Sequence, residues 1–345
     1  MRIQVNETRR LTPGVRAGLD VARALAALYV VAHHTIDLAG PLRAIFSFGQ
    51  EAVLVFFLLS GFVIFANERD RSARPRGYYL RRLRRIYPPM VFAMVVSTVL
   101  WGLGLIPVSP SWQSALGTLF ALQDIDVLKP GVIVGPYLGN SPLWSLSYEI
   151  AFYLLFPFVM ILWRRSQLAT RIVVPAVCVL AYGSYLLLPN HFSLVLAYFM
   201  LWWAGAMAAH LWMSGRLNLR SSLPEVSGLL SLSLVAFVGV FVYGFSGLGF
   251  FPFLIARHFL FAIALYFLLL TPVRKWMARS SLGLAGPAAT VASISYGIYV
   301  IHYPVLVQTG ADRTWVFVPA LALTVLLAWV ADRALPSLLP KAPRS

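Results

Sequence analysis

Long apolar runs separated by short polar segments make up most of this 345-residue chain. Ten of the runs have the roughly 17–22 residues that an α-helix needs to cross a bilayer. They cover approximately residues 18–37, 46–66, 87–106, 144–163, 172–189, 193–213, 226–244, 253–271, 290–309 and 314–333. The pattern predicts an all-α, polytopic membrane protein with about ten transmembrane helices in a single domain over residues 1–345.

Composition and charge agree with this prediction. Hydrophobic residues are 59% of the chain and charged residues only 12%, which excludes an ordinary soluble domain. The formal net charge of +16 would suit a nucleic-acid-binding protein, but the basic residues follow no such motif. Of the 28 lysines and arginines, 23 fall in alternate segments on the side of the N-terminus, including eight arginines in 67–86. This bias predicts that both termini are cytoplasmic.

Ionisable residues inside the predicted spans are costly, at about 2.5–3.5 kcal/mol each near mid-membrane. Arg23, Glu149 and Arg257 are such residues. Each must be paired, hydrated in a cavity or bound to a ligand. Glu149 and Arg257 both lie near the predicted outer ends of their spans, so we expect them to be partners.

The first span combines a charged residue with a base. On an α-helix, Arg23 and His34 lie about 20° apart in azimuth and ~16 Å apart in height, so they share one face. Asp37 follows His34 by three residues, which would let it hold one ring nitrogen. His33 points elsewhere and is assigned to packing. The alternative for Arg23 is a structural role, paired with Asp20 or reaching the cytoplasmic headgroups.

An arginine cluster precedes the third predicted span, in the run YLRRLRRIYPP at 79–89. It contains two overlapping Arg-x-x-Arg pairs, Arg81/Arg84 and Arg82/Arg85, and its two closing prolines suit the first turn of a helix. Guanidinium groups three residues apart can converge on a phosphate. The cluster is therefore either a phosphate clamp or a signal for membrane topology, and the residues leave open which pair would bind.

The ninth span carries further polar groups. Counted along a straight helix, His302 lies roughly 18 Å from the inner end, at the level of His34. Tyr299 and its neighbours add hydroxyl groups, although an interfacial belt of aromatic residues accounts for them equally well. The chain thus has an inner, arginine-rich layer and an outer layer capable of acid–base chemistry. Such a layout suits a cytoplasmic, phosphate-bearing donor and an outward-facing acceptor.

The longest outer connection, 107–143, contains helical spacing of apolar residues over Trp112–Gln123. We expect a short helix in the outer interface, either a plain surface helix or a lid. We find no internal repeat, a signature of many secondary transporters. The single cysteine, Cys178, excludes an internal disulfide.

Five segments, in this order, resemble the acyltransferase-3 family of integral-membrane O-acyltransferases. They are LDVARALAALYVVAHH at 19–34, FFLLSGFVI at 56–64, RRLRRIYP at 81–88, WSLSYEIAFYLLFP at 144–157 and SISYGIYVIHYP at 293–304. The resemblance implies transfer of an acyl group, commonly acetyl, from cytoplasmic acyl-CoA to a sugar hydroxyl. The acceptor would be a cell-envelope polysaccharide, a lipid-linked glycan or a glycoside, and the location the inner membrane of a bacterium.

The resemblance also implies roles for particular residues. His34 would be the catalytic histidine and Arg23 its partner in the donor site. Arg82 and Arg85, the best match to the family's arginine pair, would hold the phosphates of acyl-CoA, and Glu149 would be a second catalytic residue.

Three further residues are expected on the acceptor side of the reaction. His302, Tyr299 and Arg257 would contact the acceptor, while Asp37 would assist the catalytic histidine; no metal is expected. The competing hypotheses are a flippase or transporter of a lipid-linked sugar, and a polysaccharide polymerase. The missing repeats disfavour the first, and the lack of arginine in the loop 107–143 disfavours the second.

Overall fold

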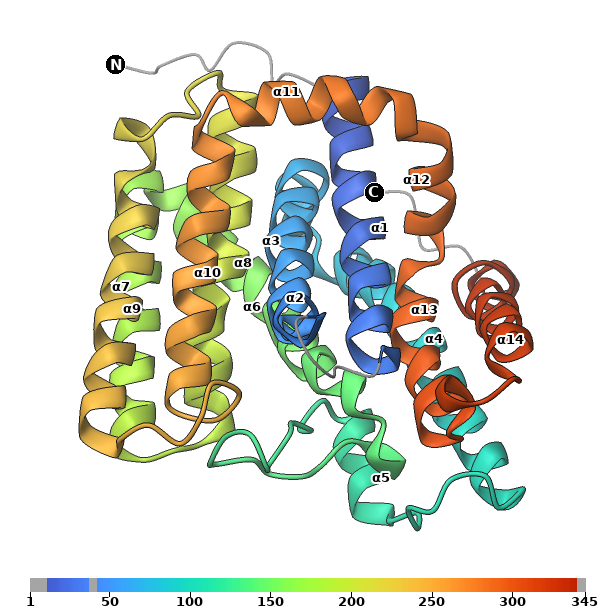
Figure 1. Ribbon diagram of the computed structural model, residues 1–345. Coiled ribbons are helices and arrows are strands. Elements are labelled where there is room, and N and C mark those ends of the chain that lie inside the picture. The colour runs from blue at the N-terminus through green and yellow to red at the C-terminus, as the bar shows by residue number, and fades with distance from the viewer. Residues whose placement is uncertain (1–10, 37–41, 340–345) are drawn as a thin grey trace. The chain divides into compact units, whose positions relative to one another are not determined.

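A computed structural model describes residues 11–36 and 42–339. This part of the chain consists of helices, turns and loops and contains no β-strand, which confirms the predicted all-α class (Figure 1). The main helices are α1 (Pro13–Thr35), α2 (Leu42–Phe46), α3 (Gly49–Glu68), α4 (Pro75–Gly102), α5 (Trp112–Leu119), α6 (Trp144–Arg165), α7 (Gln167–Leu187), α8 (His191–Met213), α9 (Leu223–Tyr243), α10 (Phe253–Leu270), α11 (Val273–Ser280), α12 (Ala285–Ser293), α13 (Ser295–His302), α14 (Phe317–Trp329) and α15 (Leu335–Leu338).

Eight helical segments of the described part are long and apolar enough to cross a membrane, or nine if a bent pair is counted as one span. Helix α1 is as long as these segments, but its polar residues lower its hydropathy. Adding α1 to these nine segments gives ten, which is the predicted number of spans. The cytoplasmic location of both termini stays a prediction.

Two predicted spans have different bounds in the structure. Helix α4 begins at Pro75, so the arginine cluster lies on the helix itself, and Pro88 and Pro89 lie in its interior rather than in its first turn. The prediction that Pro88 and Pro89 lie in the first turn of a helix is therefore wrong, and the bounds of the membrane span stay a prediction. The ninth span is not one straight helix either, because it is bent by 50° at Ile294, whose backbone is not helical.

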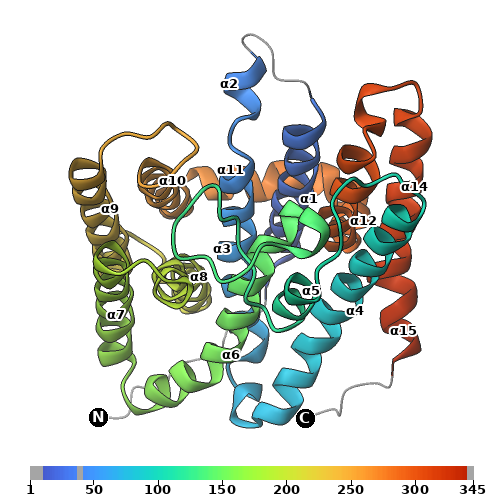
Figure 2. The same ribbon diagram turned by 90° about the horizontal axis from the view of Figure 1, so that it is seen from below.

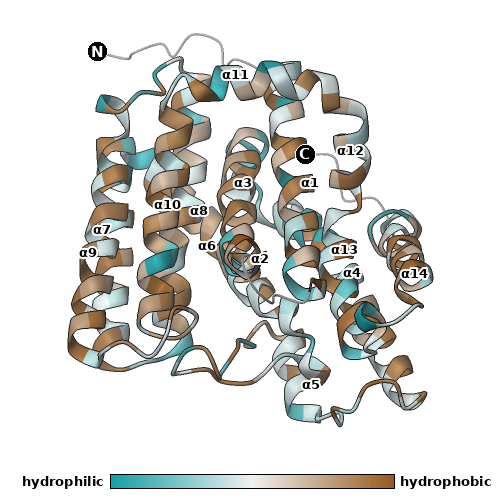
Figure 3. Ribbon diagram, in the orientation of Figure 1, coloured by the Kyte–Doolittle hydropathy of each residue, from teal (hydrophilic) through white to brown (hydrophobic). Residues whose placement is uncertain are grey.

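The chain divides into two compact units, and the single domain expected over 1–345 stays a prediction. The first unit contains residues 54–73 and 156–288 together with the chain up to residue 22. Its helices α7, α8, α9 and α10 pack against one another as a bundle, seen end-on in Figure 2. Apolar residues run along α7, α9 and α10 (Figure 3), and many are exposed, as expected of helices that face lipid.

Close backbone contact joins α3 and α8 in this unit. A Cβ atom added at Gly61 would lie 1.9 Å from the Trp202 carbonyl oxygen, and one added at Gly205 would lie 2.0 Å from the Leu58 carbonyl oxygen. No larger side chain fits at either position. Without a strong hydrophobic drive between helices in lipid, such small-residue contacts are a main source of helix association.

The second unit contains residues 23–53, 74–155 and 289 onward. Helix α13 packs against both α4 and α14, and a π-helical turn follows each of α13 and α14, at Tyr303–Gln308 and Val330–Ala334. Such turns are rare and occur often at functional sites. Helix α5 confirms the short helix predicted after Trp112, although it ends at Leu119.

Candidate functional site

The second unit brings together two histidines that lie 268 residues apart in the chain. Val31 of α1 packs against a small apolar cluster that contains Ile298 of α13. His34 is three residues beyond Val31 and His302 is four beyond Ile298, so both rings project from the same faces as the apolar contact. His34 Nδ1 lies 3.1 Å from His302 Nε2, and the Tyr303 ring meets the His34 ring edge-on at 5.1 Å. The two rings therefore lie side by side, and their depth in the membrane stays a prediction.

The tyrosine one turn before His302 extends these contacts to α6. The Tyr299 and Ser145 hydroxyls lie 2.9 Å apart, and both residues are buried. Asn140 lies just before the short helical turn that leads into α6. Its side-chain amide donates to the Val300 carbonyl at 2.9 Å. These bonds hold α13 against the start of α6.

Glu149 follows Ser145 by one helical turn on the same face of α6. The Tyr153 hydroxyl donates to its carboxylate at 2.5 Å. The Arg82 guanidinium lies over the ring of Tyr153 at 5.8 Å and over that of Tyr78 at 5.9 Å, both within cation–π range. One carboxylate is thus connected to one arginine through a single tyrosine.

We call this series of residues the polar track. It consists of His34, His302, Tyr299, Ser145, Glu149, Tyr153 and Arg82. All of its members belong to the second unit. Direct contacts run from His34 to Ser145 and from Glu149 to Arg82, and one turn of α6 joins these two sets.

The second predicted phosphate-binding arginine has its own partners. Arg85 Nη1 lies 3.5 Å from the Asp332 carboxylate, and its guanidinium lies over the Tyr296 ring at 5.9 Å. The Asp332 side chain is fully buried and also accepts from the Gly297 backbone N–H at 2.7 Å. Arg85, by contrast, keeps 41% of its side chain exposed, so it can still be reached by an anion.

Arg84 has a different environment from the neighbouring arginines. It donates to the carbonyl groups of Pro336 and Leu339, at 3.1 and 3.0 Å. These are terminal carbonyls of the last helix, which lack partners within the helix. Since Arg84 is occupied in this way, the geometry favours Arg82 and Arg85 over the overlapping pair as candidate anion ligands.

Three predicted residues, Arg23, Asp37 and Arg257, are not members of the polar track. Arg23 lies on α1, half-buried, on the N-terminal side of His34. Asp37 falls outside the described residues, so its support of His34 stays a prediction. Arg257 lies on α10, in the first unit, and both its pairing with Glu149 and its contact with the acceptor stay predictions.

The packing role predicted for His33 is confirmed. Its Nδ1 bonds the Phe46 carbonyl, and its ring fills the space beside Gly49, where an added Cβ would lie 2.2 Å from the ring. The neighbouring histidines on α1 therefore have different partners: His33 bonds the Phe46 carbonyl, and His34 faces His302 of α13.

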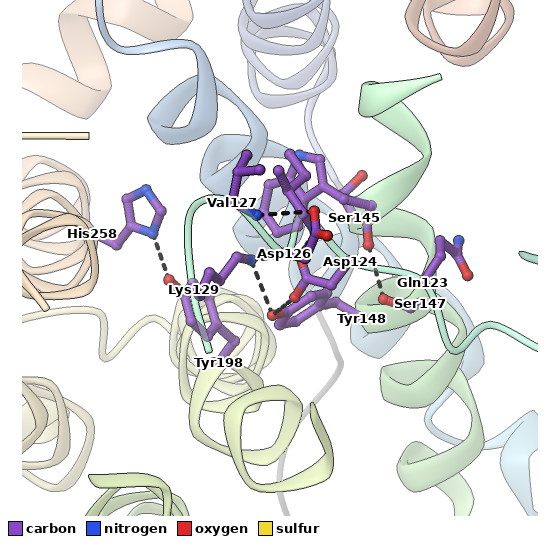
Figure 4. Close-up of polar contacts among 12 residues, drawn as sticks. Gln123, Asp124, Asp126, Val127, Lys129, Ser145, Ser147, Tyr148, Tyr198 and His258 are labelled. Atoms are coloured by element: carbon purple, nitrogen blue, oxygen red, sulfur yellow. Dashed lines mark hydrogen bonds and ion pairs between the residues drawn. The ribbon is translucent and has the colours of Figure 1, made fainter. Parts of the chain in front are cut away.

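A buried ion pair in the loop 107–143 was not predicted from the sequence. Lys129 Nζ lies 2.7 Å from the Asp124 carboxylate, and both side chains are fully buried. The Tyr148 hydroxyl lies between them, donating to Asp124 at 2.5 Å and lying 3.3 Å from Lys129 (Figure 4). Lys129 also lies over the Trp144 ring at 4.3 Å. The loop is therefore anchored onto the first turns of α6 and is not a plain surface segment.

The sequence signals for the missed residues differ. Asp332 is an ionisable residue inside a predicted span, so the rule that singled out Arg23 also applies to it. Tyr153 is one of many tyrosines, and nothing in the sequence distinguishes it. Asp124 and Lys129 lie in a loop, where charged residues are usually solvated.

Metal ligation is not a feature of the described residues. Among residues 11–36 and 42–339, no three His, Cys, Asp or Glu side chains cluster as metal ligands would. The polar groups of the second unit are instead imidazole, hydroxyl, carboxylate and guanidinium groups. They define a helical membrane protein with a histidine pair linked by polar contacts to arginines.

Comparison with known proteins narrows this class. The family model of the acyltransferase domain matches residues 16–333, so the chain belongs to the acyltransferase-3 family, as its motifs predict. Acyltransferase MdmB of Streptomyces mycarofaciens is 37% identical over 120 residues, which are 34% of this chain and 29% of that protein. Peptidoglycan O-acetyltransferase OatA of Listeria monocytogenes serovar 1/2a is 24% identical over 342 residues, which are 90% of this chain and 51% of that protein.

A third relative covers a smaller part of the chain. Nodulation protein 10 of Rhizobium leguminosarum bv. viciae is 29% identical over 199 residues, 52% of this chain and 53% of that protein. The chain spans about half the length, or less, of the curated relatives that it matches. No solved structure matches it significantly.

Proposed function

We propose that this protein is a membrane O-acyltransferase. It moves an acyl group, acetyl in the simplest case, from cytoplasmic acyl-CoA to a sugar hydroxyl of an envelope polysaccharide, a lipid-linked glycan or a glycoside in a bacterial inner membrane. The observation that carries the proposal is the polar track, which joins a histidine to an arginine within one compact unit. Family membership and relatives named as O-acetyltransferases support it.

The donor binds through its phosphates. Arg82 and Arg85 supply guanidinium groups on one face of α4, and Arg23 supplies a third from α1. A planar guanidinium matches phosphate oxygens with two parallel hydrogen bonds, which an ammonium group cannot do. The extended arm of acyl-CoA then follows α1 over the ~16 Å from Arg23 to His34 and delivers the thioester to the histidine pair.

The chemistry is general-base catalysis at His34. The histidine takes the proton of the acceptor hydroxyl as that oxygen attacks the thioester carbonyl carbon. A C–O bond forms, the C–S bond breaks, and the proton passes from His34 to the departing CoA thiolate. The Glu149 carboxylate, a member of the polar track, is negatively charged and stabilises the transient imidazolium.

The test is transfer of labelled acetyl from acetyl-CoA in membranes that contain the full chain. His34→Ala should abolish transfer while inserting at the wild-type amount. His33→Gln is the matched control, because it keeps a donor for the Phe46 carbonyl and should stay active. Wild-type transfer by His34→Ala would refute the proposal. Movement of a lipid-linked sugar without consumption of acetyl-CoA would favour the flippase instead.

A further inference from the structure

The hydrogen-bonding state of His302 follows from its neighbours. Its Nδ1 lies 2.9 Å from the Ile298 carbonyl oxygen, and a carbonyl only accepts. Nδ1 therefore carries the hydrogen. The ring is fully buried, which disfavours a charged form without a counter-ion. In the neutral ring, Nε2 is then an acceptor.

This state determines that of His34. Its Nδ1 faces the His302 Nε2 at 3.1 Å, and two bare ring nitrogens would repel each other. His34 Nδ1 must therefore donate, so in the neutral ring Nε2 holds the free lone pair. The Val30 carbonyl, one turn earlier on α1, is a further hydrogen-bond partner of the His34 ring.

We propose that His302 is a positioning residue for His34, which it holds in the tautomer whose Nε2 serves as the base. The inference rests on the proposed function and replaces the acceptor-binding role expected for His302 from the sequence. The series from the base inward is His34, His302 and the Ile298 carbonyl. It has the logic of a triad in which a third group orients the second.

The same contact stabilises the charge that forms during transfer. When His34 Nε2 takes the hydroxyl proton, Nδ1 keeps its hydrogen and donates it more strongly to His302. No proton moves to His302, and His34 returns to neutrality when it protonates the CoA thiolate. A neutral imidazole costs less to bury within a membrane protein than a carboxylate would, because only a charged partner has a large desolvation penalty.

Packing holds both rings in this geometry. The ring centroids of His34 and His302 lie 5.2 Å apart, and Tyr303 closes the edge of His34. His302 ends α13 just before the π-helical turn, and Tyr299 ties the same helix to α6. His302 therefore has little freedom to turn away.

Two substitutions separate positioning from packing or acceptor binding. His302→Gln keeps an acceptor oxygen near the position of Nε2, whereas His302→Leu fills the volume without one. We expect His302→Leu to lower kcat by about 10²–10⁴-fold with the KM for acceptor within about twofold, and His302→Gln to restore much of kcat. His33→Gln is the matched control, because the His33 ring bonds the Phe46 carbonyl rather than His302, and it should stay near wild-type kcat.

The outcomes are distinct. Wild-type kcat in His302→Leu, a loss confined to the KM for acceptor, or equal loss in both His302 variants would overturn the proposal. If the wild-type chain transfers no acetyl at all, the proposed function itself fails. The positioning role fails alone when the wild-type chain is active and one of the outcomes above is found.

A second measurement does not depend on how the variants fold. In wild-type protein labelled with ¹⁵N-histidine, solid-state NMR distinguishes protonated from bare ring nitrogens, and His34→Gln assigns the signal. We expect protonated Nδ1 and bare Nε2 in His34. The opposite tautomer would overturn the proposal.

Discussion

The buried Asp124–Lys129 pair gives the sharpest test of how the loop 107–143 is held against α6. Replacing Lys129 by methionine keeps most of the volume of the side chain but removes its charge. It leaves the Asp124 carboxylate fully buried beside the Tyr148 hydroxyl, which donates to it. The substitution also removes the cation from the ring of Trp144.

The expected cost follows from burial. Both side chains are fully buried, so solvent screening does not reduce the effect. Removing one partner of such a pair costs about 3–5 kcal/mol, because an uncompensated charge remains. Removing both costs much less, and we expect the double variant Asp124→Leu/Lys129→Met to lie within about 1 kcal/mol of the wild type.

The state of Lys129 in the folded protein supports this choice of site. Burial lowers the pKa of its amino group, and the Asp124 carboxylate opposes that change. The ammonium form therefore depends on Asp124. Asp124→Leu alone should then be as harmful as Lys129→Met alone, since either leaves one buried group without its partner.

The assay is a double-mutant cycle on the free energy of unfolding, measured by denaturant titration of the full chain in detergent micelles. Asp126→Asn, which alters an exposed aspartate of the same loop, is the control and should change stability by less than about 0.5 kcal/mol. Single variants that unfold like the wild type, or a double variant less stable than either single one, would refute the reasoning.

Two further predictions concern helix packing and the donor arginines. Gly205→Leu should destabilise the chain by more than about 2 kcal/mol, since the new side chain meets the backbone of α3, while Gly183→Leu, with nothing within 4 Å, should have little effect on unfolding. Arg82→Gln should raise the KM for acetyl-CoA at least about tenfold through loss of a charged hydrogen bond, whereas Arg84→Gln should lower stability and leave that KM unchanged. If both variants raised the KM for acetyl-CoA equally, the assignment of Arg82 rather than Arg84 to the donor site would be wrong.

Hydropathy alone located most of the spans, because a lipid environment allows few other arrangements of apolar runs. The same physics made His34, Glu149 and the arginines stand out: in an apolar run, each polar residue is costly and therefore informative. The same reasoning applies to Asp332, which lies inside a predicted span but was not predicted as a functional residue. The start of α4 was predicted too late in the chain. Paired prolines such as Pro88 and Pro89 are typical of a first helical turn, whereas this helix continues through them.

What only the tertiary structure decided is which polar groups meet. His34 and His302 lie 268 residues apart, and their contact depends on how α1 packs against α13. No local pattern encodes that packing. The connection of Glu149 to Arg82 through Tyr153 depends likewise on the placement of α4 beside α6. Sequence determined which residues can carry charge or protons in the membrane, and folding determined their partners, because hydrogen bonds depend on distance and direction in space.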